Sequence, residues 1–123
     1  MKKQQEFAAE GMVSVWIGNF ASEQQFDRYM NLTNDFENDF GFKIDNCSIR
    51  EGVAESSSKP IGELLDGFSS CESFSGAAVE ACKNLGIDRA TTMIVFYAVK
   101  FDPSKVVTNP SAPLKFIGSF PFW

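Results

Sequence analysis

The sequence contains no histidine, and this absence excludes several kinds of site. Without an imidazole, the chain cannot assemble a Ser–His or Cys–His nucleophile pair, or a zinc site with histidine ligands. Its three cysteines also cannot supply the four sulfur ligands of an all-cysteine zinc site. Acid–base chemistry would have to rest on carboxylates, lysine or tyrosine. We therefore expect no catalytic residue, no bound metal and no cofactor, and we predict that the protein is not an enzyme.

A disulfide framework, a signal peptide and a membrane span are also missing. Cys47, Cys71 and Cys82 are odd in number and show no Cys-x-x-Cys spacing, so we expect small buried thiols in a reducing compartment. Residues 4–6 are polar where a signal peptide needs an apolar stretch. The longest apolar run, residues 93–99, is too short to cross a bilayer. We expect a cytoplasmic protein without membrane contact.

The charge is unbalanced, with 16 acidic residues against 11 basic ones and a net charge of −5. A net negative charge disfavours direct nucleic-acid binding, because phosphate backbones repel a negatively charged protein. The same charge favours association with basic partners. Much of the excess lies within residues 35–55, which hold six acids and only two bases. These six acids are our candidate contact residues: Asp35, Glu37, Asp39, Asp45, Glu51 and Glu55. The plainer interpretation is a solvated acidic face that keeps the protein soluble.

Aromatic residues are dominated by one type, because 13 phenylalanines accompany only two tryptophans and two tyrosines. A 44% hydrophobic and 22% charged composition is typical of a globular chain. The length of 123 residues suffices for one domain with its own core. We therefore expect residues 1–123 to form a single domain with an aromatic-rich core. The polar residues 1–10 are expected to be a flexible N-terminal segment, and residues 52–59 a flexible loop.

Hydrophobic alternation predicts a strand over residues 12–18 and another over residues 114–120. Residues 91–101 are apolar on both faces, which predicts a central strand covered on both sides. A weaker alternation over residues 42–49 indicates one more strand. Trp16 is expected in the core, whereas Trp123 is equally compatible with the core and with a surface anchor for a partner.

Helix signals separate these strands. Ser22 and Gln25 fit a capping box at the start of a helix, and Pro60 suits the first turn of a second. A small-residue stripe over residues 77–85, ended by Gly86, predicts another. Whether residues 33–41 continue the first helix or form a separate short one stays open. The element order predicts an α+β fold, with a mixed, largely antiparallel sheet of three to five strands and about three to four helices packed on it.

Three local motifs begin a functional pattern without completing it. Residues 18–20 lie between a strand and a helix, but they lack the spacing of a dinucleotide or phosphate loop. The alternating acids of residues 35–39 resemble the start of a calcium loop, but the following residues do not complete an EF-hand. Residues 56–59 read Ser-Ser-Ser-Lys, and neighbouring loop residues rarely face each other, so we interpret them as a linker rather than a nucleophile pair.

Five sequence blocks follow one another in an order typical of one family. They are residues 13–20, which read Val-Ser-Val-Trp-Ile-Gly-Asn-Phe, and residues 70–74, 85–87, 94–101 and 116–120. Together they resemble the immunity protein 22 family of bacterial polymorphic-toxin systems over about residues 12–120, with Cys71 as a departure from its pattern. We interpret the motif residues as mostly structural: Trp16, Gly18, Asn19, Phe20, Ser73, Phe74, Gly118 and Phe120.

The resemblance implies an α+β fold and a non-catalytic protein that binds a cognate toxin domain, often a nuclease, and blocks its active site or substrate groove. A nuclease needs a basic groove to hold phosphate, so the six acids of residues 35–55 become candidate toxin contacts. The alternative is a small-molecule-binding or carboxylate-dependent hydrolytic domain, which would need a pocket holding two or more acids with shifted pKa values. An assembly subunit would instead expose a large apolar patch.

Overall fold

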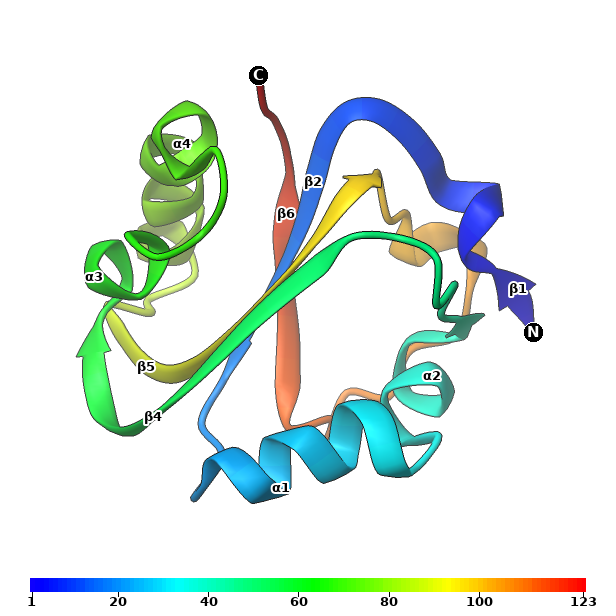
Figure 1. The fold of residues 1–123 in the computed structure, drawn as a ribbon, viewed down its shortest axis with the longest axis horizontal. Coiled ribbons are helices and arrows are strands. Elements are labelled where there is room, and N and C mark those ends of the chain that lie inside the picture. Colours follow the sequence, from blue (N-terminus) through cyan, green and yellow to red (C-terminus); the bar gives the residue numbers. More distant parts are fainter.

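The computed structural model describes residues 1–123, and its main element is a four-stranded antiparallel sheet (Figure 1). Its strands, in the spatial order β4-β5-β2-β6, are β4 (Arg50–Pro60), β5 (Arg89–Val99), β2 (Ala8–Gly18) and β6 (Leu114–Pro121). A second, two-stranded parallel sheet pairs β1 (Lys2–Lys3) with β3 (Phe42–Lys43). The expected α+β class, with a mixed and largely antiparallel arrangement of strands, is confirmed.

Helices cover both faces of the main sheet, so the fold has three layers (Figure 1). On one side lie α3 (Ile61–Leu65) and α4 (Cys71–Asn84). On the other lie α1 (Glu23–Asp27), the π-helical turn η2 (Arg28–Leu32) and α2 (Asp35–Phe40). Two short 3-10 turns complete the chain, η1 (Gln4–Phe7) and η3 (Pro103–Lys105). No helix has the length and apolar character that crossing a membrane requires.

Alternation along the two inner strands divides the core into two clusters. On β2, Val15 packs beneath α3 and α4, while its neighbour Trp16 packs against the opposite helices. On β5, Val95 and Phe96 divide in the same way. The α4 face holds Val13, Val15, Ile17, Ile61, Leu64, Leu65, Phe68, Phe74, Ala78, Cys82, Ala90, Met93, Val95, Tyr97 and Ile117. The α2 face holds Phe7, Trp16, Phe26, Tyr29, Met30, Phe36, Phe40, Phe42, Ile94, Phe96, Val99, Phe101 and Leu114.

Two sequence predictions about the core are confirmed by this arrangement. Of the predicted residues 91–101, all up to Val99 lie in β5, which pairs with both β4 and β2 and is covered on both faces. Trp16 is fully buried, and six phenylalanine rings surround its indole at centroid distances of 5.0 to 6.3 Å. The aromatic-rich core therefore lies on the α2 face. Trp123, in contrast, is 84% exposed.

Residues 33–41 contain a break and then a separate helix. Thr33 is extended, with φ of −129° and ψ of 175°, so the helical chain that begins at α1 ends there. The Thr33 hydroxyl accepts a hydrogen bond from the Asp35 N–H (3.2 Å), and α2 begins anew at Asp35. Gly41 then ends α2 in the left-handed region, at φ of 76°, which a glycine adopts without strain.

Three expectations about strands, loops and the N-terminal segment differ from the structure. Residues 52–59 lie within β4 rather than in a loop, because Val53 and Ala54 pair with the hydrophobic strand β5 and continue the sheet. The strand expected over residues 42–49 is limited to β3, because Asp45 starts a turn whose backbone and side chain bond to the next residues. Residues 1–10, expected to be flexible, include β1, η1 and the buried Gln4 and Phe7.

Candidate functional site

Two of the predicted contact carboxylates anchor α2 within the fold. Asp39 accepts hydrogen bonds from the Tyr29 hydroxyl (2.7 Å) and from Asn109 Nδ2 (2.9 Å). Glu37 accepts a hydrogen bond from the Ile44 N–H (2.7 Å). These bonds tie α2 to the preceding turn, to the chain after β3 and to the loop before β6. Both carboxylates therefore have a structural task in addition to any contact they make with a partner.

Two more candidates are bonded in a similar way. Asp45 accepts a hydrogen bond from the Cys47 N–H (2.9 Å). Glu51 accepts hydrogen bonds from the N–H (2.8 Å) and hydroxyl (2.7 Å) of Ser69 and from the Tyr97 hydroxyl (2.7 Å). Burial raises the pKa of Glu51, but the hydrogen bonds from Ser69 and Tyr97 outweigh it and hold that pKa below its usual value.

Asp35 and Glu55 are the two candidates whose carboxylates form no hydrogen bond within the protein. None of the six candidates forms a salt bridge, because the single ion pair of the structure joins Lys2 to Glu6. Glu51 and Glu55 extend from β4 on the same side as Val53, which packs on the α4 face. The α2 carboxylates lie on the other side of the sheet. The acidic run of the sequence is therefore divided between two sides of the molecule.

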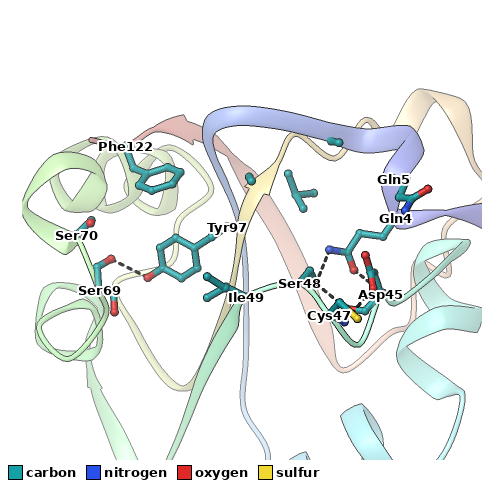
Figure 2. Close-up of a pocket in the computed structure, with 13 residues that line it drawn as sticks. Gln4, Gln5, Asp45, Cys47, Ser48, Ile49, Ser69, Ser70, Tyr97 and Phe122 are labelled. Atoms are coloured by element: carbon teal, nitrogen blue, oxygen red, sulfur yellow. Dashed lines mark hydrogen bonds between the residues drawn. The ribbon is translucent and has the colours of Figure 1, made fainter.

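A cavity of about 520 Å³ lies where five segments meet: the N-terminal segment, residues 45–49 just before β4, residues 69–70 just before α4, the end of β5 and the C-terminal segment (Figure 2). Most of its lining is apolar. Tyr97, Phe122, Ser69 and Ser70 lie toward one end, Gln4, Asp45, Cys47 and Ser48 toward the other, and Ile49 lies between them (Figure 2). Sequence reasoning missed this site, because no local pattern links five segments that lie far apart in the chain.

The polar end of the cavity is organised by Gln4, which is 4% exposed. Its Oε1 accepts a hydrogen bond from the Asp45 N–H (2.8 Å), and its Nε2 donates to the Ser48 hydroxyl (2.7 Å). The Ser48 hydroxyl also donates to the carbonyl oxygen of Asp45 (2.7 Å). The N-terminal segment thus fixes the turn that carries Cys47. Cys47 is exposed, which corrects the expectation that all three thiols are buried.

The other end of the cavity is built on unusual backbone. Ser70 (φ of 58°) and Ala98 (φ of 59°) are the two non-glycine residues with positive φ, and both line the cavity. Such conformations cost about 1–3 kcal/mol each and persist where their surroundings hold them. The buried Ser14 holds the chain just after Ala98, because its hydroxyl donates to the Val99 carbonyl (2.8 Å) and accepts from the Phe101 N–H (2.9 Å).

Tyr97 joins the cavity to the acidic side chains of β4. Its hydroxyl lies 2.7 Å from both Glu51 Oε1 and the Ser69 carbonyl oxygen. Burial, and then the hydrogen bond to Glu51, raise the pKa of Tyr97, so the phenol remains a hydrogen-bond donor at neutral pH. These two hydrogen bonds hold the Tyr97 side chain in place as one wall of the cavity. They do not create a pair of groups that transfers a proton.

A second cavity, of about 460 Å³, brings Glu51, Glu55 and Glu63 together between β4 and α3. The lowered pKa of Glu51 favours the ionised form, whereas a carboxylic acid that donates protons near neutral pH needs a raised pKa. The hydrolytic alternative therefore gains no support from this cavity. No group of three or more His, Cys, Asp or Glu side chains is positioned to hold a metal ion.

The family-motif residues at the end of β2 make contacts within the fold. A Cβ on Gly18 would lie 2.3 Å from the carbonyl oxygen of Pro113, so only glycine permits this approach. Asn19 Oδ1 accepts a hydrogen bond from the Thr91 N–H (3.1 Å). The ring of Phe20 packs against Tyr29, with 5.3 Å between the ring centroids. These contacts support the structural interpretation of the motif.

The remaining motif residues also contact the fold. Phe74 is fully buried on the α4 face. Ser73 Oγ donates to the Ser70 carbonyl (2.8 Å) and accepts from the Trp123 N–H (3.2 Å), which holds the C-terminal residue against α4. Gly118 has φ of 148°, and the ring of Phe120 lies over it, 2.9 Å from where a Cβ would be.

Comparison with known proteins gives one match. A family model described as Immunity protein 22 matches residues 13–122. No curated protein and no solved structure matches the chain. The matched residues begin within β2 and extend past β6, so they include β4, β5, β6, the second half of β2 and both helical layers.

Proposed function

The chain belongs to the immunity protein 22 family, and from this premise we propose that it binds a cognate bacterial toxin domain and neutralises it by blocking the active site or substrate groove. The observation that carries the proposal is the family match over residues 13–122. Neutralisation by binding needs a fixed surface and no catalytic group. We place the encounter in the cytoplasm, because three free thiols, one of them exposed, suit a reducing compartment.

The net charge of −5 supports a basic partner, such as a nuclease with a phosphate-binding groove. Among the six candidate carboxylates, Asp35 and Glu55 have no competing hydrogen bond, so they are the most available to toxin lysines or arginines. The other four remain candidates, because a carboxylate accepts several hydrogen bonds. Asp35 and Glu55 lie on opposite sides of the sheet, and their separate effects on binding will identify the side that meets the toxin.

The test uses the toxin domain encoded beside this gene, first in rescue of cells that express it and then in binding measurements. We expect wild type to rescue growth, and Asp35→Asn or Glu55→Gln to weaken binding and reduce its salt dependence. Truncating one partner of a buried, bonded charge pair costs about 2–5 kcal/mol. Glu80→Gln is the matched control, because it removes one exposed charge from α4, outside residues 35–55.

Each result has a defined consequence. If wild type neither binds nor rescues, the proposed function is wrong for this toxin pair. If wild type binds and both variants retain its affinity and its salt dependence, these acids are not contacts, and the acidic run keeps the protein soluble instead. Asp35→Asn and Glu55→Gln change charge at carboxylates that form no hydrogen bond within the protein. Alanine at Asp39 would also remove the hydrogen bonds to Tyr29 and Asn109, so its effects on binding and on stability could not be separated.

A further inference from the structure

We propose that the 520 Å³ cavity beside Tyr97 receives a large apolar side chain of the toxin, with a basic toxin residue next to Asp45. This inference rests on the proposed function and adds the chemistry of the contact. It assigns the centre of the interface to the end of the sheet, outside most of the acidic run. The occupant is defined by two features of the cavity, its apolar walls and the charges that line it.

The apolar character of the occupant follows from the walls. Ile49 is 68% exposed at the cavity, and its carbonyl accepts a hydrogen bond from the Tyr97 N–H (3.0 Å), which fixes its position beside β5. Tyr97 and Phe122 pack edge to face, with 5.4 Å between their ring centroids. Concave apolar surfaces of this kind hold the anchoring side chains that dominate binding energy in protein interfaces.

The basic neighbour follows from the charges. No lysine or arginine lines the cavity, and Asp45 is its one charged residue. Asp45 Oδ1 accepts the Cys47 N–H, and Oδ2 has no hydrogen bond within the protein. A cation beside this oxygen gains a partner, whereas an anionic ligand finds none. The net charge of −5 attracts the same class of partner from a distance.

The cavity is also held open before any partner arrives. Gln4 fixes the turn at one end, and the positive-φ residues Ser70 and Ala98 shape the other. A partner that enters a preformed cavity avoids the cost of ordering these segments. This preorganisation explains why backbone strain is retained where the five segments meet.

Cys47 provides a test in the wild-type protein, because its exposed thiol lines the cavity. We expect iodoacetamide to alkylate Cys47 more slowly when the toxin domain is bound, so that the remaining rate is proportional to the fraction of protein left unbound. N-acetylcysteine in the same tube is the reference for the reactivity of a free thiol. Mass spectrometry of the peptide that contains Cys47 measures the rate. Equal alkylation rates in the free protein and in the saturated complex would overturn the proposal.

A variant gives the second test. Ile49→Glu adds a negative charge that favours a basic partner, so a loss of affinity reports the apolar contact; we expect at least about a thirtyfold loss. Val107→Glu is the matched control, because Val107 is 89% exposed and lies outside the cavity lining. If Ile49→Glu binds as tightly as the control, the cavity is not the anchor, although the proposed function stands. If wild type also fails to bind, the proposed function fails with it.

Discussion

The two faces of the main sheet are filled in different ways. On the α4 face, a 14-residue helix approaches the sheet through small side chains, with Ala78 and Cys82 fully buried. On the α2 face, helices of five and six residues and a π-helical turn cover the sheet, and aromatic rings fill the space beneath them. Short helices have little stability of their own, so large rings that reach the sheet hold them in place.

The polar anchors of the two faces are, in contrast, alike. Each face has one buried tyrosine whose hydroxyl bonds to a carboxylate at 2.7 Å, Tyr29 with Asp39 and Tyr97 with Glu51. Burial, and then the bond to the carboxylate, raise the pKa of both tyrosines. The comparison separates two ways of attaching helices to a sheet: the faces differ in apolar packing and share a means of polar attachment.

The largest effect is expected from the same substitution made on each face. Phe36 on α2 and Phe74 on α4 are both fully buried. Phe36 contacts five other rings, whereas Phe74 contacts only that of Tyr97. We expect Phe36→Ala and Phe74→Ala each to lower the free energy of unfolding by about 3–5 kcal/mol, with Phe36→Ala the more costly because ring pairs add to the burial term. Urea denaturation measures both.

This expectation fails in a specific way. If Phe74→Ala costs as much as Phe36→Ala or more, the rings of the α2 face contribute only their buried area, and the proposed difference between the faces disappears. As a control, the free energy of unfolding should fall with urea concentration at the same rate in both variants. An equal slope shows that the two substitutions change the stability of the folded state in a comparable way.

A smaller effect is expected from adding volume on the α4 face. Ala78 is fully buried between α4 and the sheet, whereas the neighbouring Ala77 is exposed. Ala78→Leu should lower the free energy of unfolding by about 1–3 kcal/mol, because close packing leaves no room for the larger side chain. Ala77→Leu is the matched control and should change stability little. Equal effects of the two variants would contradict close packing at Ala78.

Sequence predicted the inner strands and the edge strand β6 well, and the other edge strand, β4, badly. The strands β2 and β5 carry alternating or continuous apolar residues, so their local pattern agrees with their place in the sheet. Residues 52–59 carry small and polar side chains that lack a strand pattern, and they join β4 because β5 supplies partners for Val53 and Ala54. Tertiary pairing here overrides local propensity.

The candidate site was predictable only in part, for a similar reason. The sequence identifies six acidic residues, but whether each carboxylate is free to bind a partner depends on contacts between residues distant in the chain. The hydrogen bond from Tyr97 to Glu51, for example, joins residues that are 46 positions apart. The cavity depends on such contacts entirely, since Gln4 and Ser48 are 44 residues apart. Local patterns indicate which residues carry charge, and the fold decides which of those charges remain free.

The smallest effect is expected at the polar anchor of the α4 face, and it depends on pH. Because the pKa of folded Glu51 lies below its ordinary value of 4.5, ionised Glu51 stabilises the fold above that pH, and this stabilisation is lost as pH falls through the folded pKa. Glu51→Gln should therefore unfold more easily than wild type at neutral pH, by a small amount because solvent screens a partly exposed carboxylate. The two free energies of unfolding should converge under acidic conditions well below pH 4.5. A difference that stays constant as the pH falls would show that the bonds of Glu51 to Ser69 and Tyr97 do not depend on its charge.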